Sequence, residues 1–414
     1  MALIVKKFGG TSVGTVDKIK NVGERVKATL EKGNDVVVVL SAMSGDTNRL
    51  IGLANEASSR ALGTPAYDMI LSSGEQVSIG LLALALSEMG IEATPMLGWQ
   101  VPIVTDSMNC SARISEIKTE GILGELKKGR VVIVAGFQGV DPEGHITTLG
   151  RGGSDTTAVA IAAAIKADLC EIYTDVDGVF TTDPSICKEA RKIEKISYDE
   201  MLEMASLGAK VLQTRSVEFA KKYDVPLMVR SSFSDREGTL VCKEDKEMEK
   251  VAVSGITYNK NEAKISVVRV PDRPGIAAML FKPLTEKGIN VDMIVQNISH
   301  AGHTDMTFTV LKEDYPRAFD IVKEIADDIE AENVDGNTDI AKISIVGAGM
   351  RSHAGVASLM FETLSGNGVN IQMISTSEIK VSCIIDETQT EKAVEVLHKA
   401  FELGKNEVKE EVGI

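Results

Sequence analysis

An arginine placed among glycines is the first feature of this sequence that suggests chemistry. The stretch TTLGRGGSDTT, residues 147–157, sets Arg151 between glycines and continues with Ser154 and Asp155. Glycines let backbone amides approach a ligand closely, and a guanidinium can hold a carboxylate through two parallel hydrogen bonds. The pattern favours a site for a small anion. Two alternatives remain: Arg151 pairs with a structural acid, or Ser154 and Asp155 only cap the following helix.

A lysine followed by two glycines suggests a second anion site near the N-terminus. KKFGGTS places Lys7 at the end of a predicted strand, directly before Gly9 and Gly10. Turn amides and helix N-termini bind phosphate, and a lysine adds a full positive charge. The alternative is an ordinary strand-to-helix turn with a surface lysine.

Two further segments carry carboxylates. TDVDGVFTTDP, residues 174–184, contains Asp175 and Asp177 and follows a predicted strand. An Asp-rich turn is usually only a turn, but this position at a strand end favours a nucleotide or metal role. Glu75, in SSGEQ, stands near the start of an apolar helix, where glutamates are also common because of the helix dipole.

Known nucleotide signatures are missing. The sequence contains no GxxxxGK[ST] motif, which argues against a P-loop protein. Gly347 and Gly349 imitate the start of a dinucleotide fingerprint, but Ser352 stands where its third glycine would fall. His145 lies near the glycine loop and is interpreted as a loop residue rather than a catalytic base.

The elements that must position these segments form an α/β pattern. Short apolar runs predict strands at 3–8, 36–40, 131–135, 170–174 and 226–230. Runs of this kind are typical of parallel strands that are buried on both faces. Because open α/β sheets bind ligands at the carboxyl edge of their strands, the candidate segments should meet in one crevice.

The last third of the chain is an internal repeat. It follows the charged run at 243–250, which predicts a solvated linker. KISVV at 264–268 recurs as KISIV at 342–346, and residues 274–294 recur as 354–374. Each copy predicts a strand, a glycine turn, a helix, two strands and a helix. A repeated small α+β unit is usually a structural or binding module.

Composition excludes several classes of protein. The net charge of −15 leaves no basic surplus for nucleic acid. The five cysteines form no CxxC pair, which argues against a zinc or disulfide framework and favours a reducing compartment. No apolar stretch approaches the roughly 18 residues of a membrane span, and the apolar run at the N-terminus is too short for a signal sequence.

Taken in order, six segments resemble the aspartate kinase family of the amino-acid-kinase superfamily. They are KKFGGTSV, VLSAMSGDTN, SSGEQ, TTLGRGGSDTTA, YTDVDGVFTTDP and GAKVLQTRS. The C-terminal repeat resembles the paired ACT regulatory domains of that family, so the resemblance covers essentially the whole chain. It implies a three-layer αβα kinase domain with a mostly parallel central sheet at 1–245. It also implies ferredoxin-like ACT regions at 251–335 and 336–414, the first copy inserted within the second and 251–258 pairing across them.

The reaction implied by the resemblance is ATP-dependent phosphorylation of the β-carboxylate of L-aspartate to 4-phospho-L-aspartate. This is the first step toward lysine, threonine and methionine, and it takes place in the cytoplasm. Mg²⁺ would accompany ATP, with no protein side chain assigned to the metal. A carboxylate nucleophile is already ionised at neutral pH, so the reaction needs no general base.

The resemblance also assigns roles to individual residues. Lys7, Gly9, Gly10 and Ser154 would hold the transferring phosphate, and Asp155 would organise the catalytic centre. The residues around aspartate would be Ser41, Thr47, Glu75, Arg151 and Ser154, with Arg151 on the α-carboxylate and Glu75 near the ammonium. Thr174, Asp175 and Asp177 would lie along ATP, with Phe180 and Lys210 near the nucleoside. The chain departs from the family at Ser185, where Arg is common, and at Gln213-Thr214, where His-Pro is common; both leave the ATP contacts open.

In each repeat a glycine turn opens a helix whose amides would hold the carboxylate of a small amino acid. The effector residues are expected to be Asp272, Gly275, Ile276, Ala277, Asn290, Gln296, Asn370 and Ser375. The resemblance implies lysine, threonine or both as effectors, and a homo-oligomer formed through the ACT regions. A shorter regulatory chain starting near Met248 is also implied; alternatively, Met248 is only a linker residue.

Two rival functions stay open at this stage. One is an amino-acid sensor with a silent kinase domain, against which the intact Lys7, Arg151 and Asp155 count. The other is a kinase for glutamate, acetylglutamate or carbamate. A fused homoserine dehydrogenase is not expected, because little chain follows the second repeat.

Overall fold

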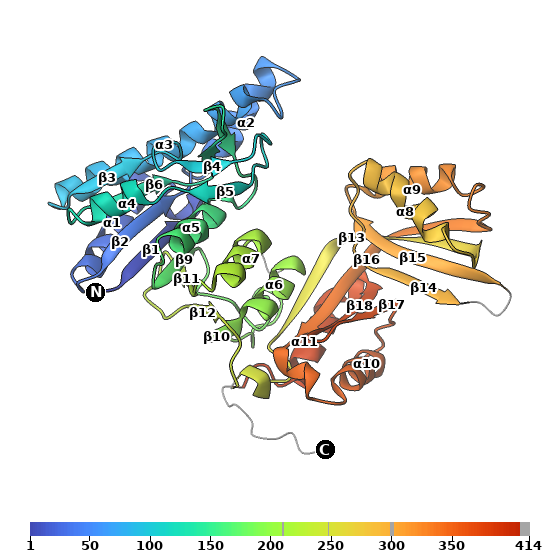
Figure 1. Ribbon diagram of the computed structural model, residues 1–414. Helices are drawn as coiled ribbons and strands as arrows, with labels where there is room; N and C mark the ends of the chain where they lie inside the picture. The colour runs from blue at the N-terminus through green and yellow to red at the C-terminus, as the bar shows by residue number, and fades with distance from the viewer. Residues whose placement is uncertain (209–210, 247, 299–301, 406–414) are drawn as a thin grey trace. The chain divides into compact units, whose positions relative to one another are not determined.

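The computed structural model describes the chain except for residues 209–210, 247, 299–301 and 406–414 (Figure 1). Two compact units are present. The first comprises Met1–Val179, Lys192–Ser206 and Lys210–Met248, and the second comprises Phe180–Arg191, Leu207–Ala209 and Glu249–Ile414.

An eight-stranded sheet forms the centre of the first unit, in the order β10-β12-β11-β9-β1-β2-β6-β3. All neighbours in the sheet run parallel except β11 and β12, which are antiparallel. The strands are β1 (Leu3–Phe8), β2 (Asp35–Leu40), β3 (Ala93–Met96), β6 (Val131–Ala135), β9 (Leu169–Thr174), β10 (Lys195–Ser197), β11 (Leu227–Ser231) and β12 (Thr239–Cys242). The mostly parallel sheet is confirmed, and its five predicted strands correspond to β1, β2, β6, β9 and β11.

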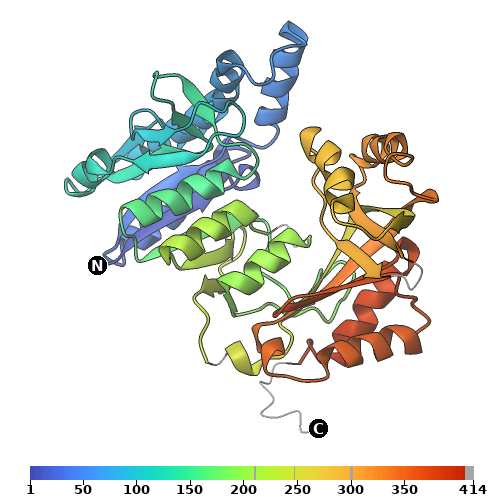
Figure 2. The same cartoon turned by 45° about the vertical axis from the view of Figure 1, so that its right-hand side comes forward.

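Helices cover both faces of this sheet and complete the three-layer arrangement (Figures 1 and 2). On one face α1 (Val16–Leu30) and α3 (Pro65–Glu88) share a core with β1, β2 and β6 that includes Ile19, Val26, Leu82 and Leu86. On the other face α5 (Gly153–Ala164) packs against β1, β2 and β9. The remaining elements are α2 (Asp46–Ala57), α4 (Glu120–Leu126), α6 (Tyr198–Ser206), α7 (Thr214–Tyr223), a short 3-10 turn η1 (Gly10–Ser12) and a small sheet of β4 (Ile103–Thr105), β5 (Ile114–Ile117), β7 (Gln138–Val140) and β8 (Ile146–Thr148).

Helix α3 is long and apolar enough to cross a membrane by length and composition, which the sequence analysis did not anticipate. Its position in the fold gives another reason for that composition. It packs against α1, α2 and β6 and buries two carboxylates, Asp68 and Glu75, inside the protein. A helix that buries two carboxylates against neighbouring elements is typical of a protein core.

The second unit contains one six-stranded sheet in the order β14-β15-β13-β16-β18-β17, with α8 and α9 from the first repeat and α10 and α11 from the second. The strands are β13 (Gly255–Pro271), β14 (Ile294–Ile298), β15 (His303–Leu311), β16 (Asn333–Val346), β17 (Met373–Thr376) and β18 (Lys380–Asp386). The helices are α8 (Ile276–Glu286), α9 (Tyr315–Glu324), α10 (Val356–Gly366) and α11 (Thr390–Ala400). This order of elements confirms the predicted α+β repeat.

The two repeats exchange a strand segment. The start of β13, from Gly255 to Asn259, pairs antiparallel with Lys342–Val346 at the end of β16. Val253 and Ile256 accordingly belong to the apolar core of the second repeat, whereas Ile265 and Val267 belong to that of the first. The first copy is therefore inserted within the second, as the family resemblance implied.

A short excursion of the chain, Phe180–Arg191, also belongs to the second unit. Thr181 Oγ1 lies 3.0 Å from Nε2 of the buried His398, and the Thr181 carbonyl accepts from Ile256 N at 2.7 Å. Tyr258 OH donates to Asp183 Oδ2 at 2.8 Å, and Cys187 is part of the apolar core. No pattern in the sequence predicted this arrangement.

The charged run at 243–250 is not the uniformly solvated linker that composition predicted. Met248 is buried and begins a 3-10 turn, η2 (Met248–Lys250), and Asp245 forms an ion pair with Lys195. An apolar residue within a charged segment packs against the fold because burial removes its surface from water.

Candidate active site

A cavity of about 300 Å³ opens at the carboxyl ends of β1 and β2. Its walls are the glycine turn after β1, the loop after β2, the glycine loop before α5, and one side chain of α3. Eight predicted site residues line it together: Lys7, Gly10, Ser41, Thr47, Glu75, Arg151, Ser154 and Asp155. Segments separated by more than 140 residues in the sequence thus converge on one space, as the strand-end argument predicted.

A depression of about 530 Å³ runs along α3 and is lined by Gln76, Val77, Gly80, Leu81, Ala83, Leu84 and Pro95. None of these side chains is charged or titratable. Its lining offers no group for phosphate or for proton transfer, and the chemistry therefore lies in the smaller, polar cavity.

Lys7 and Asp155, which both line this cavity, form an ion pair. Lys7 Nζ lies 2.5 Å from Asp155 Oδ1, and each side chain is 11% exposed. Lys7 comes from β1 and Asp155 from the first turn of α5. Glycine is favoured at position 10, where a Cβ would lie only 3.0 Å from the Ala42 carbonyl oxygen, whereas a Cβ on Gly9 would make an ordinary contact at 3.4 Å from Lys7 Nζ.

The glycine loop is shaped by the residue before the helix rather than by a polar cap. Gly152 is the N-cap of α5, with φ +69°, in the left-handed region that favours glycine. The alternative that Ser154 and Asp155 cap the helix is therefore wrong, since both lie inside its first turn, and both line the cavity as predicted for site residues. There the amides and dipole of a helix N-terminus favour an anion.

Gln213 and Arg215 support this loop from α7. A Cβ on Gly152 would overlap the Gln213 side chain, and Arg215 donates to the carbonyl oxygens of Leu149 and Ala112 at 2.9 and 2.8 Å. Gln213 is one of the two departures from the family pattern. In this chain it packs against the glycine loop, a role that the sequence did not indicate.

Glu75 is a buried carboxylate with an unused oxygen. Its Oε1 accepts from Ala42 N at 3.0 Å, while Oε2 has no hydrogen-bond partner among the described residues. Glu75 is only 3% exposed, and this burial raises the pKa of its carboxyl group to about 7. A cationic group entering the cavity would satisfy the free oxygen and favour the ionised form.

Asp68, about two helical turns before Glu75, is a positioning residue that sequence reasoning missed. It is fully buried and accepts from Cys110 N, Thr148 N and Thr148 Oγ1 at 2.7–3.1 Å. These bonds hold the end of β8, from which the glycine loop with Arg151 begins. In the sequence Asp68 looks like an ordinary first-turn acid of α3, so no signal separated it from that role.

Three of the residues predicted along ATP, Thr174, Asp175 and Asp177, lie at the end of β9 or directly after it and outside the lining of the cavity. Thr174 Oγ1 donates to Asp175 Oδ1 at 3.1 Å, and Asp177 accepts from Ser234 Oγ at 2.6 Å and from Arg236 at 3.2 Å. Phe180 and Ser185 belong to the second unit, where Ser185 bonds to Asp183. Lys210 lies outside the described residues.

The predicted effector residues cluster around the helix starts and edge strands of the repeats. Gly275 and Gly355 are the N-caps of α8 and α10, with φ of +100° and +93°. Asp272 and Ala277 flank the first of these turns, and Asn290 precedes β14 as Asn370 precedes β17. Gln296 lies on β14 and Ser375 on β17. Ile276 is buried in the core of the first repeat.

His145 lies in the turn between β7 and β8, where its ring and its backbone amide contact Asp141. This confirms that it is a loop residue. Asp141, Glu143 and His145 approach one another closely enough to hold an ion, but all three are absent from the lining of the cavity.

Comparison with known proteins agrees with this architecture. The model of the amino acid kinase family matches residues 2–231, and ACT domain models match 265–330 and 343–401. The chain is thus an amino-acid kinase that carries two ACT domains.

The curated relatives identify the branch of that superfamily. An aspartokinase from Pseudomonas aeruginosa is 58% identical over 405 residues, which cover 97% of this chain and 98% of the relative. An aspartokinase from Bacillus sp. is 48% identical over 411 residues, 99% of this chain and 100% of the relative. The chain belongs to the aspartate kinase family.

Solved structures support the same assignment. Aspartokinase III of E. coli in complex with aspartate and ADP has a TM-score of 0.78 and 27% identity, with 96% of this chain and 99% of that chain covered. Aspartate kinase from Synechocystis is 45% identical with a TM-score of 0.55, over 99% of this chain and 71% of that one.

Proposed function

We propose that this protein transfers the γ-phosphoryl group of ATP to the β-carboxylate of L-aspartate, and that its ACT domains inhibit the reaction when end-product amino acids bind. The observation that carries the proposal is the shared cavity. One small space contains a guanidinium for a carboxylate, a buried carboxylate for an ammonium, and an ion-paired lysine for a phosphoryl group. An amino acid with a second carboxylate satisfies all three.

Binding of aspartate follows from charge and burial. Arg151 is exposed at the cavity and is proposed to hold the α-carboxylate in a bidentate bond. Oε2 of Glu75 is proposed to accept from the α-ammonium, which would supply the partner it otherwise lacks. Ser41 and Thr47 are proposed to bond the remaining oxygens. These contacts fix the amino-acid end, so the β-carboxylate extends toward Lys7.

Phosphoryl transfer requires two anions to meet. Lys7 is proposed to leave its contact with Asp155 in part and to neutralise charge on the transferring group, with the amides after Gly9 and Gly10 and the first turn of α5 as further donors. Between turnovers, Asp155 is proposed to hold the ammonium group of Lys7 in place. Catalysis then consists of positioning and charge neutralisation, without a general base.

Mg²⁺ is proposed to enter with ATP. The carboxylates lining the cavity are Glu75, which bonds Ala42 N, and Asp155, which pairs with Lys7, so a dedicated protein cage does not fit them. Magnesium is usually held largely by substrate phosphates and waters. Its contribution would be to offset phosphate charge.

Feedback regulation is proposed for the two repeats, with lysine, threonine or both as the effector. Aspartokinase III from E. coli has been solved in complex with lysine and aspartate, and that structure matches this chain with a TM-score of 0.75 and 27% identity. The glycine turns before α8 and α10 supply amides for an effector carboxylate. We retain 1–245, 251–335 and 336–414 as proposed functional boundaries, and a homo-oligomer formed through the ACT regions.

The protein is proposed to act in the cytoplasm, where ATP is available and where its five free cysteines would stay reduced. A separate regulatory chain starting at Met248 remains a proposal. Such a chain would lack Phe180–Arg191, which contributes Thr181 and Cys187 to the second unit. A single full-length band from the native source would contradict it.

The test is an assay in which hydroxylamine traps the acyl phosphate. ATP with aspartate should give the hydroxamate, whereas glutamate, acetylglutamate and carbamate should not. Lysine and threonine, added separately and together, should reduce the rate. A folded protein that gives no product with aspartate would support the silent sensor, and product with another acid would support the rival kinases.

A further inference from the structure

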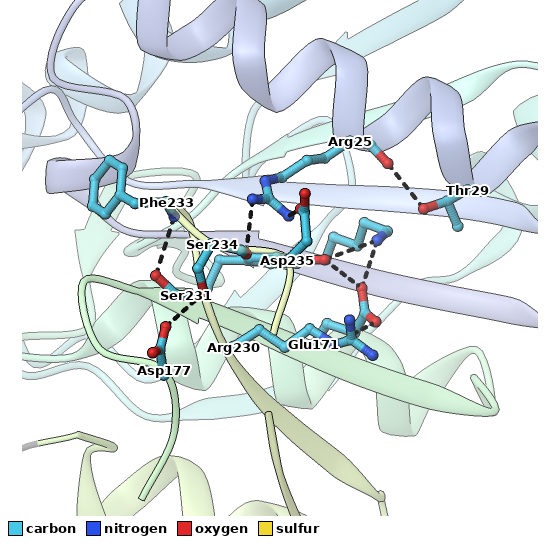
Figure 3. Close-up of polar contacts among 11 residues, drawn as sticks. Arg25, Thr29, Glu171, Asp177, Arg230, Ser231, Phe233, Ser234 and Asp235 are labelled. Atoms are coloured by element: carbon cyan, nitrogen blue, oxygen red, sulfur yellow. Dashed lines mark hydrogen bonds and ion pairs between the residues drawn. The ribbon is translucent and has the colours of Figure 1, made fainter. Parts of the chain in front are cut away.

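A loop that no sequence motif singled out joins the two segments expected to hold ATP. This serine loop, residues 232–236, lies in the connection between β11 and β12. Ser232 Oγ lies 2.5 Å from Oγ of Ser12, which follows the Gly9-Gly10 turn. Ser234 Oγ donates to Asp177 Oδ1 at 2.6 Å (Figure 3). One short loop therefore bonds both the phosphate turn after β1 and the acidic turn after β9.

The serine loop is itself anchored to α1. Arg25 donates through Nη2 to the Ser234 carbonyl oxygen at 3.0 Å and pairs through Nη1 with Asp235 at 3.2 Å. Its guanidinium lies 5.6 Å from the ring centroid of Tyr173, a buried residue of β9. Arg25 is thus held between the sheet and the loop, and it fixes the backbone at the serine that bonds Asp177.

The carboxylate of Asp177 is already engaged. Oδ1 accepts from Ser234, and Oδ2 accepts from Arg236 at 3.2 Å. An anion directed at the phosphates of ATP would repel them, whereas one directed at the loop can hold the turn in place. The Arg236 side chain is 79% exposed, so that pair contributes little, and the Ser234 bond is the stronger constraint.

We propose that Asp177 is a positioning residue that acts on the nucleotide through Ser234, and that the serine loop fixes the spacing between the phosphate turn and the acidic turn. This rests on the proposed function, because it assumes that both turns hold ATP. The loop would act on ATP and not on aspartate, since none of its residues lines the aspartate cavity.

The test compares Ser234→Ala, Asp177→Ala and the double variant, with KM measured separately for ATP and aspartate. A bond to a charged group, once lost, should raise the KM for ATP about tenfold in each single variant and leave the KM for aspartate within about twofold. If Asp177 acts through Ser234, the double variant should be no worse than either single one. Ser234→Thr, which keeps the hydroxyl, should restore the KM for ATP.

Asp177→Asn provides a check that does not depend on losing the bond. Its amide oxygen can still accept from Ser234, so the KM for ATP should rise by only about threefold. Ser115→Ala, which removes an exposed hydroxyl bonded to the Val104 carbonyl oxygen, is the matched control and should change neither KM.

Each outcome decides the proposal. Additive effects in the double variant, or an equal rise for Asp177→Asn and Asp177→Ala, would mean that Asp177 touches the nucleotide directly, and would overturn it. An equal rise in the KM for aspartate, or no rise in either, would overturn it as well. Failure of the parent protein to phosphorylate aspartate would instead remove the proposed function, and direct titration with ADP would then still test the loop.

Discussion

Lys6 and Lys7 are neighbours on β1, yet their surroundings differ because successive side chains of a strand point to opposite faces. Both form an ion pair at 2.5 Å, Lys6 with Glu171 and Lys7 with Asp155. Lys7 lines the cavity, whereas Lys6 is 3% exposed on the face covered by α1 and also donates to Tyr173 OH. A short buried ion pair is therefore not by itself a sign of catalysis; access to a ligand is what distinguishes the two.

The electrostatic character of Lys6 agrees with a structural role. Burial lowers the pKa of Lys6, and the charge of Glu171 offsets part of that shift. Glu171 has two further partners, Tyr173 OH at 3.1 Å and Arg230 at 3.3 Å. The Lys6 and Glu171 side chains are only 4% and 7% exposed, so a substrate has little access to this pair and its contribution belongs to stability.

The largest expected effect comes from Lys7. In Lys7→Met the cavity loses its cation, and kcat should fall by a factor of about 10² or more, as for other losses of transition-state charge stabilisation. The free energy of unfolding should change much less, because Asp155 keeps access to solvent through the cavity. Steady-state kinetics on protein with a native circular dichroism spectrum provides the measurement.

Lys6→Met should show the reverse. Removal of one partner from a buried pair leaves Glu171 less compensated, and we expect a loss of about 2–3 kcal/mol in the free energy of unfolding, reduced by the remaining Arg230 contact. Denaturant titration measures it. The double variant Lys6→Met with Glu171→Gln should recover part of the loss; a further drop instead would mean that Glu171 does not depend on Lys6.

Arg151→Ala sharpens the comparison on the aspartate side of the cavity. Loss of a bidentate carboxylate contact should raise the KM for aspartate about thirtyfold and leave the KM for ATP nearly unchanged. Arg130→Ala is the control, because that arginine pairs with Glu92 and Glu125 away from the cavity. A variant whose affinity falls for ATP but not for aspartate would contradict the assignment of Arg151.

A pH dependence from Glu75 is also expected. With a pKa of about 7 in the free protein, Glu75 must lose a proton before it can accept from the substrate ammonium. Below pH 7, kcat/KM for aspartate should therefore fall about tenfold per pH unit, and above pH 7 it should be constant. In Glu75→Gln this dependence should disappear; its persistence would assign the limb to another group.

Stability should respond to the same group with the opposite sign. Glu75 has a pKa of about 7 in the native state and of 4.5 in the unfolded chain. The native state therefore binds more protons between pH 4.5 and about 7. The free energy of unfolding should consequently decrease as pH rises through this window, by an amount on the order of 3 kcal/mol. Denaturant titrations of the parent and Glu75→Gln at pH 5 and pH 8 isolate this contribution.

Local sequence patterns predicted much of the fold. The continuous apolar runs correspond to central strands because both faces of a parallel sheet are buried, and the offset of 80 between Gly275 and Gly355 matched two copies of one unit. The convergence of Lys7 and Arg151 followed from strand ends that meet at one edge. Glu75 was predicted near the start of a helix, but α3 begins at Pro65 and Glu75 enters the cavity from the middle of that helix.

What the sequence could not predict depends on contacts between distant segments. Whether Lys6 or Lys7 faces the ligand depends on which face of the sheet α1 covers and which face α5 covers. The sequence of two adjacent lysines does not indicate this. Asp68 looks like a helix-dipole acid until its bonds to Thr148 are seen. The left-handed Gly152 replaced the expected polar cap. The excursion at 180–191 has no local signature because its partners, such as Tyr258 and His398, come 75 or more residues later.

The most direct test is a comparison of kcat for Lys6→Met and Lys7→Met, corrected for the folded fraction of each protein. Lys7→Met should lose a factor of about 10² or more, and Lys6→Met should stay within about twofold of the parent. Equal losses, or a larger loss for Lys6→Met, would contradict the account that phosphoryl transfer takes place on the α5 face of β1.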